Sequence, residues 1–444
     1  MTDAQTMSDQ AREKLHAEAV SITADLVSID STNTGDPATI GDGETRVCRR
    51  IAEYLDDVGI PSELVESVPG RGSLFARVEG SDPDAGGLIV HGHVDVVPAM
   101  AEDWTVPPFA GEIRDGWLYG RGTVDMKNMI GMMLAVVRHF RREGIVPRRP
   151  LLLAFFADEE AAGIMGAKWV VRERPELFAG MTHALSEVGG WSVPVAGRRL
   201  YPIAVAEKGV AWASVTAHGT AAHASRPTVD NAVAAIAGAV HRVASINFPV
   251  APTEANTSLA AAVGQITGGG GDVADLPANL DVLGHFGPLV EASLSHTASP
   301  TMLAAGYKTN VIPTEAHAEI DCRVLPGGED TFRAEIEAEL GPDVSVDWIW
   351  EPPIAAPADD PLVDVIRETV IGSDPDALVV PYLLPASTDN KHLARLGIEG
   401  YGFVPLRVPD DFDVFGHFHA VDERVPVDAL HFGADVLSRV LRSA

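Results

Sequence analysis

Cysteine is scarce in this chain: Cys48 and Cys322 are the only two in 444 residues. They lie far apart and outside any paired pattern, which excludes a cysteine zinc site and indicates a reducing compartment. We expect both to be buried as small hydrophobic side chains. The sequence also lacks an apolar run of membrane-spanning length, and residues 1–16 contain no apolar segment of the signal-peptide kind. These absences predict a soluble, cytoplasmic protein.

Positive charge is scarce as well, with 33 lysines and arginines against 63 aspartates and glutamates and a formal net charge of -30. A nucleic acid or an anionic membrane requires a basic face on its partner, so we predict that this chain binds neither. The hydrophobic content of 46% and the charged content of 22% are those of an ordinary globular protein. A chain of 444 residues exceeds what one hydrophobic core usually supports, which favours two domains.

The most informative stretch is an apolar run, 151–157, that ends in Asp158, Glu159 and Glu160. The run is long enough for a strand that is buried on both faces of a parallel sheet. Three adjacent carboxylates at the end of such a strand raise one another's pKa unless cations lie among them. Taken alone, these residues leave two explanations open, a solvated acidic turn and a metal site.

Other polar side chains follow predicted strands or turns in the same way. His93 and Asp95 come after a short apolar strand. Asp125 stands at the entrance of a predicted helix, and Glu187 follows a strand near residue 184. Open α/β sheets place their sites at the carboxyl ends of their strands, so we expect these side chains to meet at one edge. For Asp125 alone, an N-cap is the alternative explanation.

Histidines and carboxylates without thiolates suit zinc, cobalt or manganese in a catalytic site. Five such donors are too many for one tetrahedral zinc, but with one bridging carboxylate they supply three protein ligands to each of two metals. A water between two cations becomes hydroxide at neutral pH, and Glu159 is then a free carboxylate able to take its proton. Asp95 is placed to orient the His93 imidazole. The candidate ligands are His93, Asp125, Glu160, Glu187 and His419.

A second unit is predicted from a change of pattern after residue 206. Residues 207–219 and 316–324 alternate as half-buried strands do, and each is followed by a helical segment. This order favours a small two-layer α+β domain, with predicted limits 207–353. It interrupts a catalytic domain made of residues 1–206 and 354–444. We predict that domain to be α/β, with a mostly parallel sheet flanked by helices.

The stretch from Pro249 to Gly306 is long, largely apolar and rich in glycine and alanine. Its glycine run, 268–271, lacks a following Lys-Ser or Lys-Thr pair. We therefore interpret the run as a flexible loop and exclude a phosphate cradle. The apolar composition of the stretch favours a substrate with an uncharged acyl group.

Several of these motifs occur together in the order found in one known family. They are the segments 91–98 (HGHVDVVP), 120–127 (GRGTVDMK), 158–160 (DEE), 186–187 (SE) and 221–225 (AAHAS), followed by His419. With these motifs the chain resembles the dinuclear zinc peptidases and aminoacylases called M20, over almost its whole length. That family includes glutamate carboxypeptidase, succinyl-diaminopimelate desuccinylase, acetylornithine deacetylase and aminoacylase.

The resemblance implies two metal centres that share one ligand. Asp125 is implied as the bridging carboxylate. His93 and Glu187 would complete one centre, and Glu160 and His419 the other. Position 187 is Asp or Glu in such proteins, and glutamate there resembles the carboxypeptidase and deacylase members. The implied cofactors are two divalent ions, with zinc as the first choice and cobalt or manganese as alternatives.

Three further features are implied beside the metals. Glu159 would be the general base for a metal-bridging hydroxide. Asp95 would be the outer partner of His93. The resemblance also implies a strained cis peptide bond between Asp125 and Met126.

In the inserted domain the resemblance assigns roles to three residues. His223 is similar to the histidine that stabilises the tetrahedral oxyanion, in many members across a dimer interface. Asn310 and Arg323 match positions that hold the substrate carbonyl and carboxylate. An imidazolium suits an oxyanion, and a bidentate guanidinium suits a carboxylate. Without the resemblance, His223 is explained as a surface-loop histidine and Arg323 as a charge on a strand face.

Together these observations predict a metal-dependent hydrolase that cleaves an amide bond next to a free carboxylate. We favour N-acyl-amino-acid hydrolysis, or dipeptidase or carboxypeptidase cleavage, of a small-molecule substrate. The alternatives are a succinyl-diaminopimelate desuccinylase or acetylornithine deacetylase-like deacylase, a single-metal hydrolase, and a non-catalytic metal-binding relative. A complete set of ligands and base argues against the last, because uncompensated buried charge is costly to keep without use. The resemblance also implies a homodimer through the inserted domain, which would act as a lid and dimerisation domain.

Overall fold

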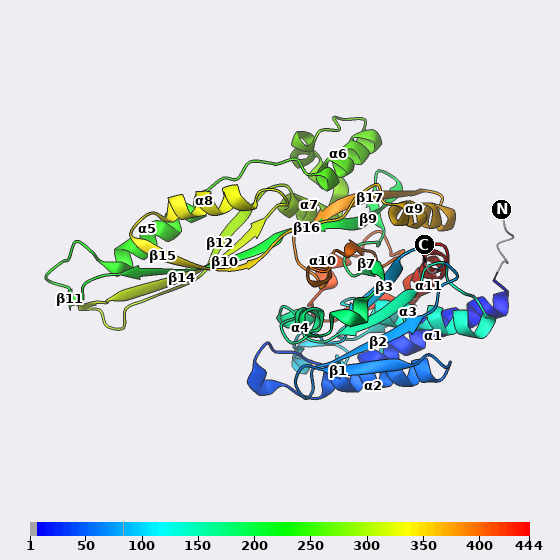
Figure 1. Cartoon of the computed structure of the whole chain (residues 1–444). Coiled ribbons are helices and arrows are strands. Elements are labelled where there is room, and N and C mark those ends of the chain that lie inside the picture. The colour runs from blue at the N-terminus through cyan, green and yellow to red at the C-terminus, as the bar shows by residue number, and fades with distance from the viewer. Residues whose placement is uncertain (1–6, 83) are drawn as a thin grey trace.

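The computed structural model describes residues 7–82 and 84–444. Its larger body is built on a ten-stranded sheet, from which a second, elongated body extends (Figure 1). The strands of the large sheet are β1 (Ser62–Glu66), β2 (Gly72–Val78), β3 (Gly87–His93), β6 (Leu151–Phe156), β7 (Met181–Ser186), β8 (Val193–Val195), β9 (Arg198–Glu207), β16 (Ile354–Ala355), β17 (Ala377–Leu384) and β18 (Glu399–Gly402). The central strands β6, β3, β7 and β18 are parallel neighbours in that order. This confirms the predicted α/β class with a mostly parallel sheet.

The apolar run forms strand β6, which is buried on both faces as predicted. Leu151, Leu153 and Phe155 belong to the main hydrophobic core, whereas Leu152 and Phe156 belong to a second cluster. Successive side chains of a strand point to opposite faces, so an unbroken apolar run is needed where both faces are covered. Burial of each such side chain stabilises the fold by about 1.5–3 kcal/mol. The strand is therefore a rigid support for the acidic turn that follows it.

Helices cover both faces of the large sheet. They are α1 (Asp9–Val27), α2 (Gly43–Asp56), α3 (Lys127–Glu143), α4 (Ala167–Glu173), α9 (Pro361–Ser373), α10 (Asn390–Ala394) and α11 (Val427–Ser443). Helices α1, α3 and α11 pack on one another over the main core, and α4 and α10 pack together over the second cluster. Helix α4 begins only at Ala167, because Ala162 and Gly163 have positive φ angles of 67° and 63° that do not fit a helix.

The structure also contains a separate three-stranded sheet. It consists of β4 (Glu112–Arg114), β5 (Trp117–Tyr119) and β19 (Arg424–Pro426). Strand β5 is central, because β19 pairs with it from the far end of the chain. Short 3₁₀ helices complete this domain: η1 (Pro37–Thr39), η2 (Ala101–Asp103), η3 (Glu159–Ala161), η4 (Pro175–Phe178) and η6 (Phe415–His417).

The elongated body is the predicted two-layer α+β unit. Its antiparallel sheet has the order β12 (Thr297–Ala305), β14 (Glu315–Val324), β10 (Gly209–His218) and β15 (Val344–Glu351). Helices α5 (Ala232–Ala244) and α8 (Glu329–Leu340) lie along one side of it (Figure 1). Alternate residues of β10 and β14 form a hydrophobic core with these helices, which explains the period of two in the sequence. The short strands β11 (Ala222–His223) and β13 (Val311–Ile312) pair at its end.

The segment between α5 and β12, for which we predicted no helices, is largely helical. It forms α6 (Glu254–Thr267), the 3₁₀ helix η5 (Val273–Phe286) and α7 (Gly287–Ser293), and its glycine run lies in the loop between α6 and η5. Helices α6 and α7 pack against β17, and η5 packs against β8, so their apolar side chains join the main core. Helices α5 and α8 already cover one face of the four-stranded sheet, and α6, η5 and α7 pack against the large sheet instead. The stretch 207–353 therefore contributes side chains to two hydrophobic cores, the main core of the large body and the core of the elongated body.

Candidate active site

The candidate ligands come together at the carboxyl edge of the large sheet. His93 is the last residue of β3, Glu187 directly follows β7, and Glu160 lies in the turn after β6. Because these three strands are parallel neighbours, their carboxyl ends lie at one edge. Asp125 arrives from the turn before α3, and His419 from the segment between η6 and β19. The N-cap of α3 is Met126, which removes the N-cap explanation for Asp125.

Asp125 lies between the two histidines. Its Oδ1 atom is 2.9 Å from His93 Nε2, and its Oδ2 atom is 3.2 Å from His419 Nε2. Glu187 approaches the first histidine, with its Oε2 atom 3.6 Å from His93 Nε2. Glu160 approaches the second, with its Oε2 atom 3.1 Å from His419 Nε2. One carboxylate thus faces two histidine–glutamate pairs, which is the arrangement that a shared bridging ligand requires.

The charges at this edge need compensation. Burial, with the neighbouring carboxylates, raises the pKa of Glu187 to about 7, and burial and the charge of Glu187 raise the pKa of Glu159 well above its usual range. Burial works against ionisation of Asp125, but hydrogen bonds from His419 and His93 hold its pKa below its ordinary value. Glu160 Oε1 is buried and has no hydrogen-bond partner among the described residues. Histidine and carboxylate donors crowded in this way fit divalent cations.

Two triads of possible ligands cluster at this edge. Donor atoms of His93, Asp125 and Glu160 lie within 4.8 Å of one another, as do those of His93, Glu159 and Glu187. The peptide bond between Asp125 and Met126 is cis, as the resemblance implies.

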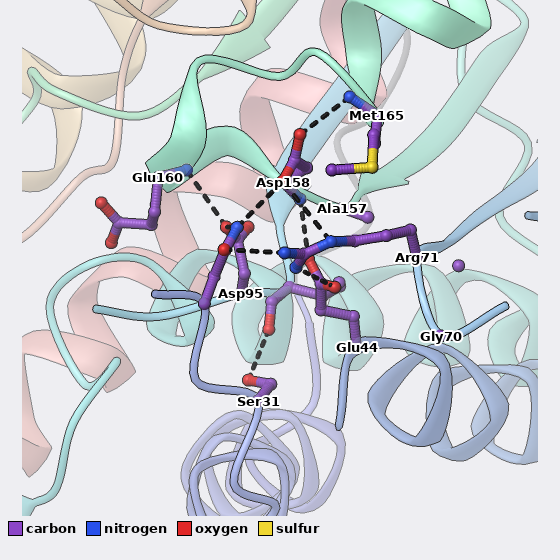
Figure 2. Close-up of polar contacts among 12 residues, drawn as sticks. Ser31, Glu44, Gly70, Arg71, Asp95, Ala157, Asp158, Glu160 and Met165 are labelled. Carbon is purple, nitrogen blue, oxygen red and sulfur yellow. Dashed lines mark hydrogen bonds and ion pairs between the residues drawn. The ribbon is translucent and has the colours of Figure 1, made fainter. Parts of the chain in front are cut away.

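Asp95 makes more contacts than an outer partner of His93 needs. The Nδ1 atom of His93 is 3.0 Å from the backbone oxygen of Asp95 and 3.5 Å from its Oδ1 atom. The Asp95 carboxylate also accepts hydrogen bonds from the backbone N–H groups of Glu159 and Glu160, each at 3.1 Å. Figure 2 shows the bond from Glu160 to Asp95 beneath the acidic turn. One carboxylate therefore links the His93 ring to the segment that holds the predicted base.

Glu423 is a site residue that the sequence reasoning missed. Its carboxylate is fully buried and accepts backbone hydrogen bonds from Gly122, Val124 and Asp125 at 3.0, 2.7 and 3.1 Å. It also pairs with Arg121 Nη1 at 2.7 Å. Glu423 thus holds the turn that presents Asp125. No spacing in the sequence connects these residues, and the only signal is that Glu423 lies close to His419.

Replacing Glu423 with alanine is expected to destabilise the fold by about 3–5 kcal/mol, because the buried guanidinium of Arg121 loses its counter-charge. Glu423→Gln keeps the shape and should cost less. Urea unfolding of the purified variants measures both effects, with the exposed Asp410→Ala as the control. An unchanged unfolding midpoint for Glu423→Ala would contradict the assigned contacts.

Three basic side chains, Lys208, Lys391 and Arg323, lie close to one another, and Lys391 also interacts with Glu159. Lys208 Nζ is buried without a hydrogen-bond partner among the described residues, and burial and Arg323 lower its pKa to about 7. Lys391 donates a hydrogen bond to the backbone oxygen of Lys208. Arg323 pairs with Asp321 at 2.7 Å and lines a cavity of about 430 Å³ that includes Phe415 and Gly416 of the segment leading to His419.

The other two residues predicted in the inserted domain lie elsewhere. His223 is exposed on β11, where its Nδ1 atom is 2.8 Å from Ser225 Oγ. Asn310 is exposed beside it, and its backbone oxygen accepts a hydrogen bond from the N–H of Ala224. Figure 1 shows β11 at the end of the elongated body that is remote from β3 and β7. Within one chain, the structure does not bring His223 or Asn310 to the candidate ligands.

An α/β domain that gathers histidine and carboxylate donors at its sheet edge, interrupted by a small antiparallel domain, defines the class of M20-type hydrolases. The sequence model described as "Peptidase family M20/M25/M40" matches residues 89–443. The chain belongs to this family, and it is a metallopeptidase or amidohydrolase family enzyme.

Curated relatives support this membership. The bovine (Bos taurus) N-fatty-acyl-amino acid synthase/hydrolase PM20D1 is 29% identical over 391 residues, covering 83% of this chain and 76% of the relative. Human (Homo sapiens) aminoacylase-1 is 28% identical over 398 residues, covering 88% of this chain and 87% of the relative.

Solved structures share the fold. An M20 family metallo-carboxypeptidase from Sulfolobus solfataricus has a TM-score of 0.72 at 16% identity, covering 96% of this chain and 98% of its own. Human carnosine dipeptidase 1 has a TM-score of 0.68 at 17% identity and covers 98% of both chains. A dinuclear metal-binding M20 peptidase from Bacillus subtilis has a TM-score of 0.56 at 15% identity, covering 96% of this chain and 98% of its own.

The membership confirms the predicted family and the predicted hydrolase class. Among the residues that the structure describes, no helix is both long and apolar enough to cross a membrane. The compartment, the dimer and the role of each site residue stay predictions.

Proposed function

We propose that this enzyme hydrolyses the amide bond of an N-acyl amino acid or a dipeptide, next to a free carboxylate. The observation that carries the proposal is the placement of Asp125 between His93 and His419, each with a glutamate beside it. When bound by the five candidate ligands, two divalent cations would polarise the substrate carbonyl and lower the pKa of a water.

Glu159 is proposed as the general base. It directly precedes the candidate ligand Glu160, and its backbone N–H bonds to Asp95. Its own carboxylate is not one of the five candidate ligands, so it is available to accept and donate a proton. Burial and the charge of Glu187 raise its pKa, which suits a group that must both take and release a proton near neutral pH. Glu159 removes a proton from the attacking water and delivers it to the leaving nitrogen. The C–N bond breaks, a C–O bond forms, and the products are a carboxylic acid and an amine.

Arg323 is proposed to hold the substrate carboxylate. Arg323 lines the cavity next to the segment that leads to His419, and Lys208, whose pKa is lowered to about 7 by burial and by Arg323, is a second basic group nearby. A planar guanidinium binds a carboxylate through two parallel hydrogen bonds. This cationic pair suits the free carboxylate that N-acyl amino acids, dipeptides and carboxypeptidase substrates share.

His223 and Asn310 are proposed to act in a second copy of the chain. Both are exposed at the remote end of the small domain, so they reach a candidate site only through another subunit. The uncovered face of the small sheet exposes Trp212, Met302 and Ile349 by 41%, 65% and 61%, an apolar surface of the kind that dimers bury. A homodimer is the expected assembly, and sedimentation of the chain as a monomer would contradict it.

The names of the similar proteins favour some candidate substrates over others. The bovine relative is named for N-fatty-acyl amino acids and the human one for aminoacylase activity, which favours N-acyl amino acids. Dipeptides come second, because human carnosine dipeptidase 1 and the yeast (Saccharomyces cerevisiae) di-peptidase Dug1p, with a TM-score of 0.70 at 15% identity, share the fold. Desuccinylation and acetylornithine deacetylation are lesser alternatives.

A substrate panel tests the proposal. The zinc-, cobalt- or manganese-loaded protein is offered N-acetyl and N-long-chain-acyl amino acids, dipeptides, a substrate with a C-terminal glutamate, succinyl-diaminopimelate and acetylornithine, with release of the free amine measured. We expect turnover of N-acyl amino acids above that of the doubly charged substrates. Turnover of succinyl-diaminopimelate or acetylornithine alone would show that the substrate class is that of the desuccinylases or deacetylases and not the proposed one. No turnover of any substrate by protein with two bound metals would overturn the proposal.

A further inference from the structure

A buried polar cluster lies beneath the acidic turn and outside the candidate ligands. It joins Asn33, Glu44 and Arg71 to Asp158, and these side chains belong to residues that are at most 4% exposed. Figure 2 shows Arg71 lying between Glu44 and Asp158 on the side of the turn opposite to the Glu160 carboxylate. We call these four residues the N-terminal clamp. The first three precede residues 89–443, the part of the chain that the family model matches.

Arg71 is the centre of the clamp. It lies directly before β2, and its guanidinium pairs with the carboxylate of Glu44 on α2. Its Nη2 atom donates to Asn33 Oδ1 at 2.8 Å, and its Nε atom lies 3.5 Å from Asp158 Oδ1. A planar guanidinium with donors in three directions is suited to hold three groups from different parts of the chain.

Asp158 is the residue of the clamp that belongs to the acidic turn. Its φ angle of 66° lies in the left-handed region, which a residue other than glycine keeps only when its surroundings hold it there. Its backbone N–H donates to Glu44 Oε1 at 2.8 Å, and its carboxylate accepts bonds from Asn33 Nδ2 at 3.0 Å and from the N–H of Met165 at 2.8 Å. The clamp thus fixes the direction in which the chain leaves β6.

The clamp also reaches the turn through Asp95. Asn33 Nδ2 donates to Asp95 Oδ2 at 2.9 Å, and the Asp95 carboxylate in turn accepts the N–H groups of Glu159 and Glu160. Among the described residues, no hydrogen-bond donor contacts the carboxylate of Glu159 itself. The placement of that carboxylate therefore depends on the backbone that the clamp and Asp95 hold.

We propose that Arg71 is a positioning residue for the proposed general base, acting through Asn33, Glu44 and Asp158 on the turn that presents Glu159. The inference rests on the proposed function and adds the N-terminal segment to it. Without the guanidinium, the carboxylates of Glu44 and Asp158 face each other in a buried space, and the turn relaxes to separate them. A displacement of about 1 Å at a reacting group lowers a rate about 10²-fold.

The test compares Arg71→Lys and Asn33→Ala with the wild type, both as metal-loaded protein. Lysine keeps the charge but cannot reach three partners. Asn33→Ala removes the amide that bonds to Arg71, Asp158 and Asp95, and it deletes no charge. We expect kcat to fall about 10- to 100-fold with KM within about threefold and the metal content unchanged. Arg77→Lys is the matched control, because Arg77 lies on β2, which Arg71 directly precedes, and among the described residues its side chain bonds only to the backbone oxygens of Leu177 and Ala179.

A second arm separates positioning from general damage. In a Glu159→Gln background, Arg71→Lys should lower kcat no further, because the group that it positions is already gone. An additive loss, or a wild-type kcat in Arg71→Lys alone, would overturn the inference. Crystal structures of wild type and Arg71→Lys provide a readout that needs no turnover: residues 158–160 are expected to shift, and an unmoved turn would overturn the clamp. Absence of wild-type turnover on the whole panel would instead overturn the proposed function.

Discussion

Glu159→Gln is expected to lower kcat by about 10³-fold while the metal content stays at the wild-type level. Glutamine has the shape of glutamate, but it cannot accept a proton from water or return one to a leaving nitrogen. The N–H of Glu159 that bonds to Asp95 belongs to the backbone, so the substitution leaves that bond in place. Steady-state kinetics on the best substrate of the panel, with metal analysis of the same preparation, measures the effect.

A matched control for this prediction is Glu173→Gln, which replaces an exposed glutamate at the end of α4. It should leave kcat and KM unchanged. If Glu159→Gln kept more than about a tenth of the wild-type kcat, proton transfer by Glu159 would not limit the reaction, and another base would have to be sought. Loss of bound metal in Glu159→Gln would point instead to a ligand role, since Glu159 also clusters with His93 and Glu187.

Asp125→Ala is expected to abolish the tight binding of both divalent ions, whereas loss of Glu187 or Glu160 should weaken one. The reason is that the two carboxylate oxygens of Asp125 face His93 and His419 separately. Binding of an ion to the folded state alone stabilises it by about 4 kcal/mol at a concentration 1,000 times Kd. The wild type should therefore melt at a higher temperature with zinc than after chelation, and this difference should vanish in Asp125→Ala.

Metal analysis and thermal melting with and without a chelator measure this result. The control is Glu399→Gln, from a third triad of possible ligands, made by His183, Asp360 and Glu399, which shares no residue with the five candidate ligands. There Arg149 Nη1 lies 2.8 Å from His183 Nδ1 and already supplies a positive charge, so the control should keep both ions. An Asp125→Ala protein that still binds one ion with wild-type affinity would show that Asp125 is not shared.

Much of the fold could be predicted because its signals are local. The unbroken apolar run of β6 indicates a strand that is buried on both faces, and the alternating pattern of β10 and β14 indicates strands that are buried on one face. The same patterns do not say what covers a face. For this reason the helices α6 and α7 were missed: their apolar side chains are buried by β17, more than 80 residues later in the chain.

The candidate site divides in the same way. His93, Glu160 and Glu187 each follow a strand, so the rule that sites lie at carboxyl edges sufficed to group them. Asp125 was grouped with them from its place at a helix entrance, His419 was counted as a fifth donor, and the resemblance added their roles. The structure now places all five side chains together, while their roles stay predictions. No motif or spacing in the sequence pointed to the contacts of Glu423 and Arg71, because each side chain bonds to residues that are distant in sequence.

By itself, the sequence determined the α/β class, the inserted two-layer unit and the family, because periodicity and motif order are properties of short segments. Only the tertiary structure decided which side chains hold the Asp125 turn and the acidic turn, where α6 and α7 pack, and that His223 lies far from the ligands of its own chain. The physical reason is that a buried carboxylate or guanidinium is stable only where hydrogen-bond and ion-pair partners lie close to it in space. Which distant segments lie close together depends on the packing of the whole fold.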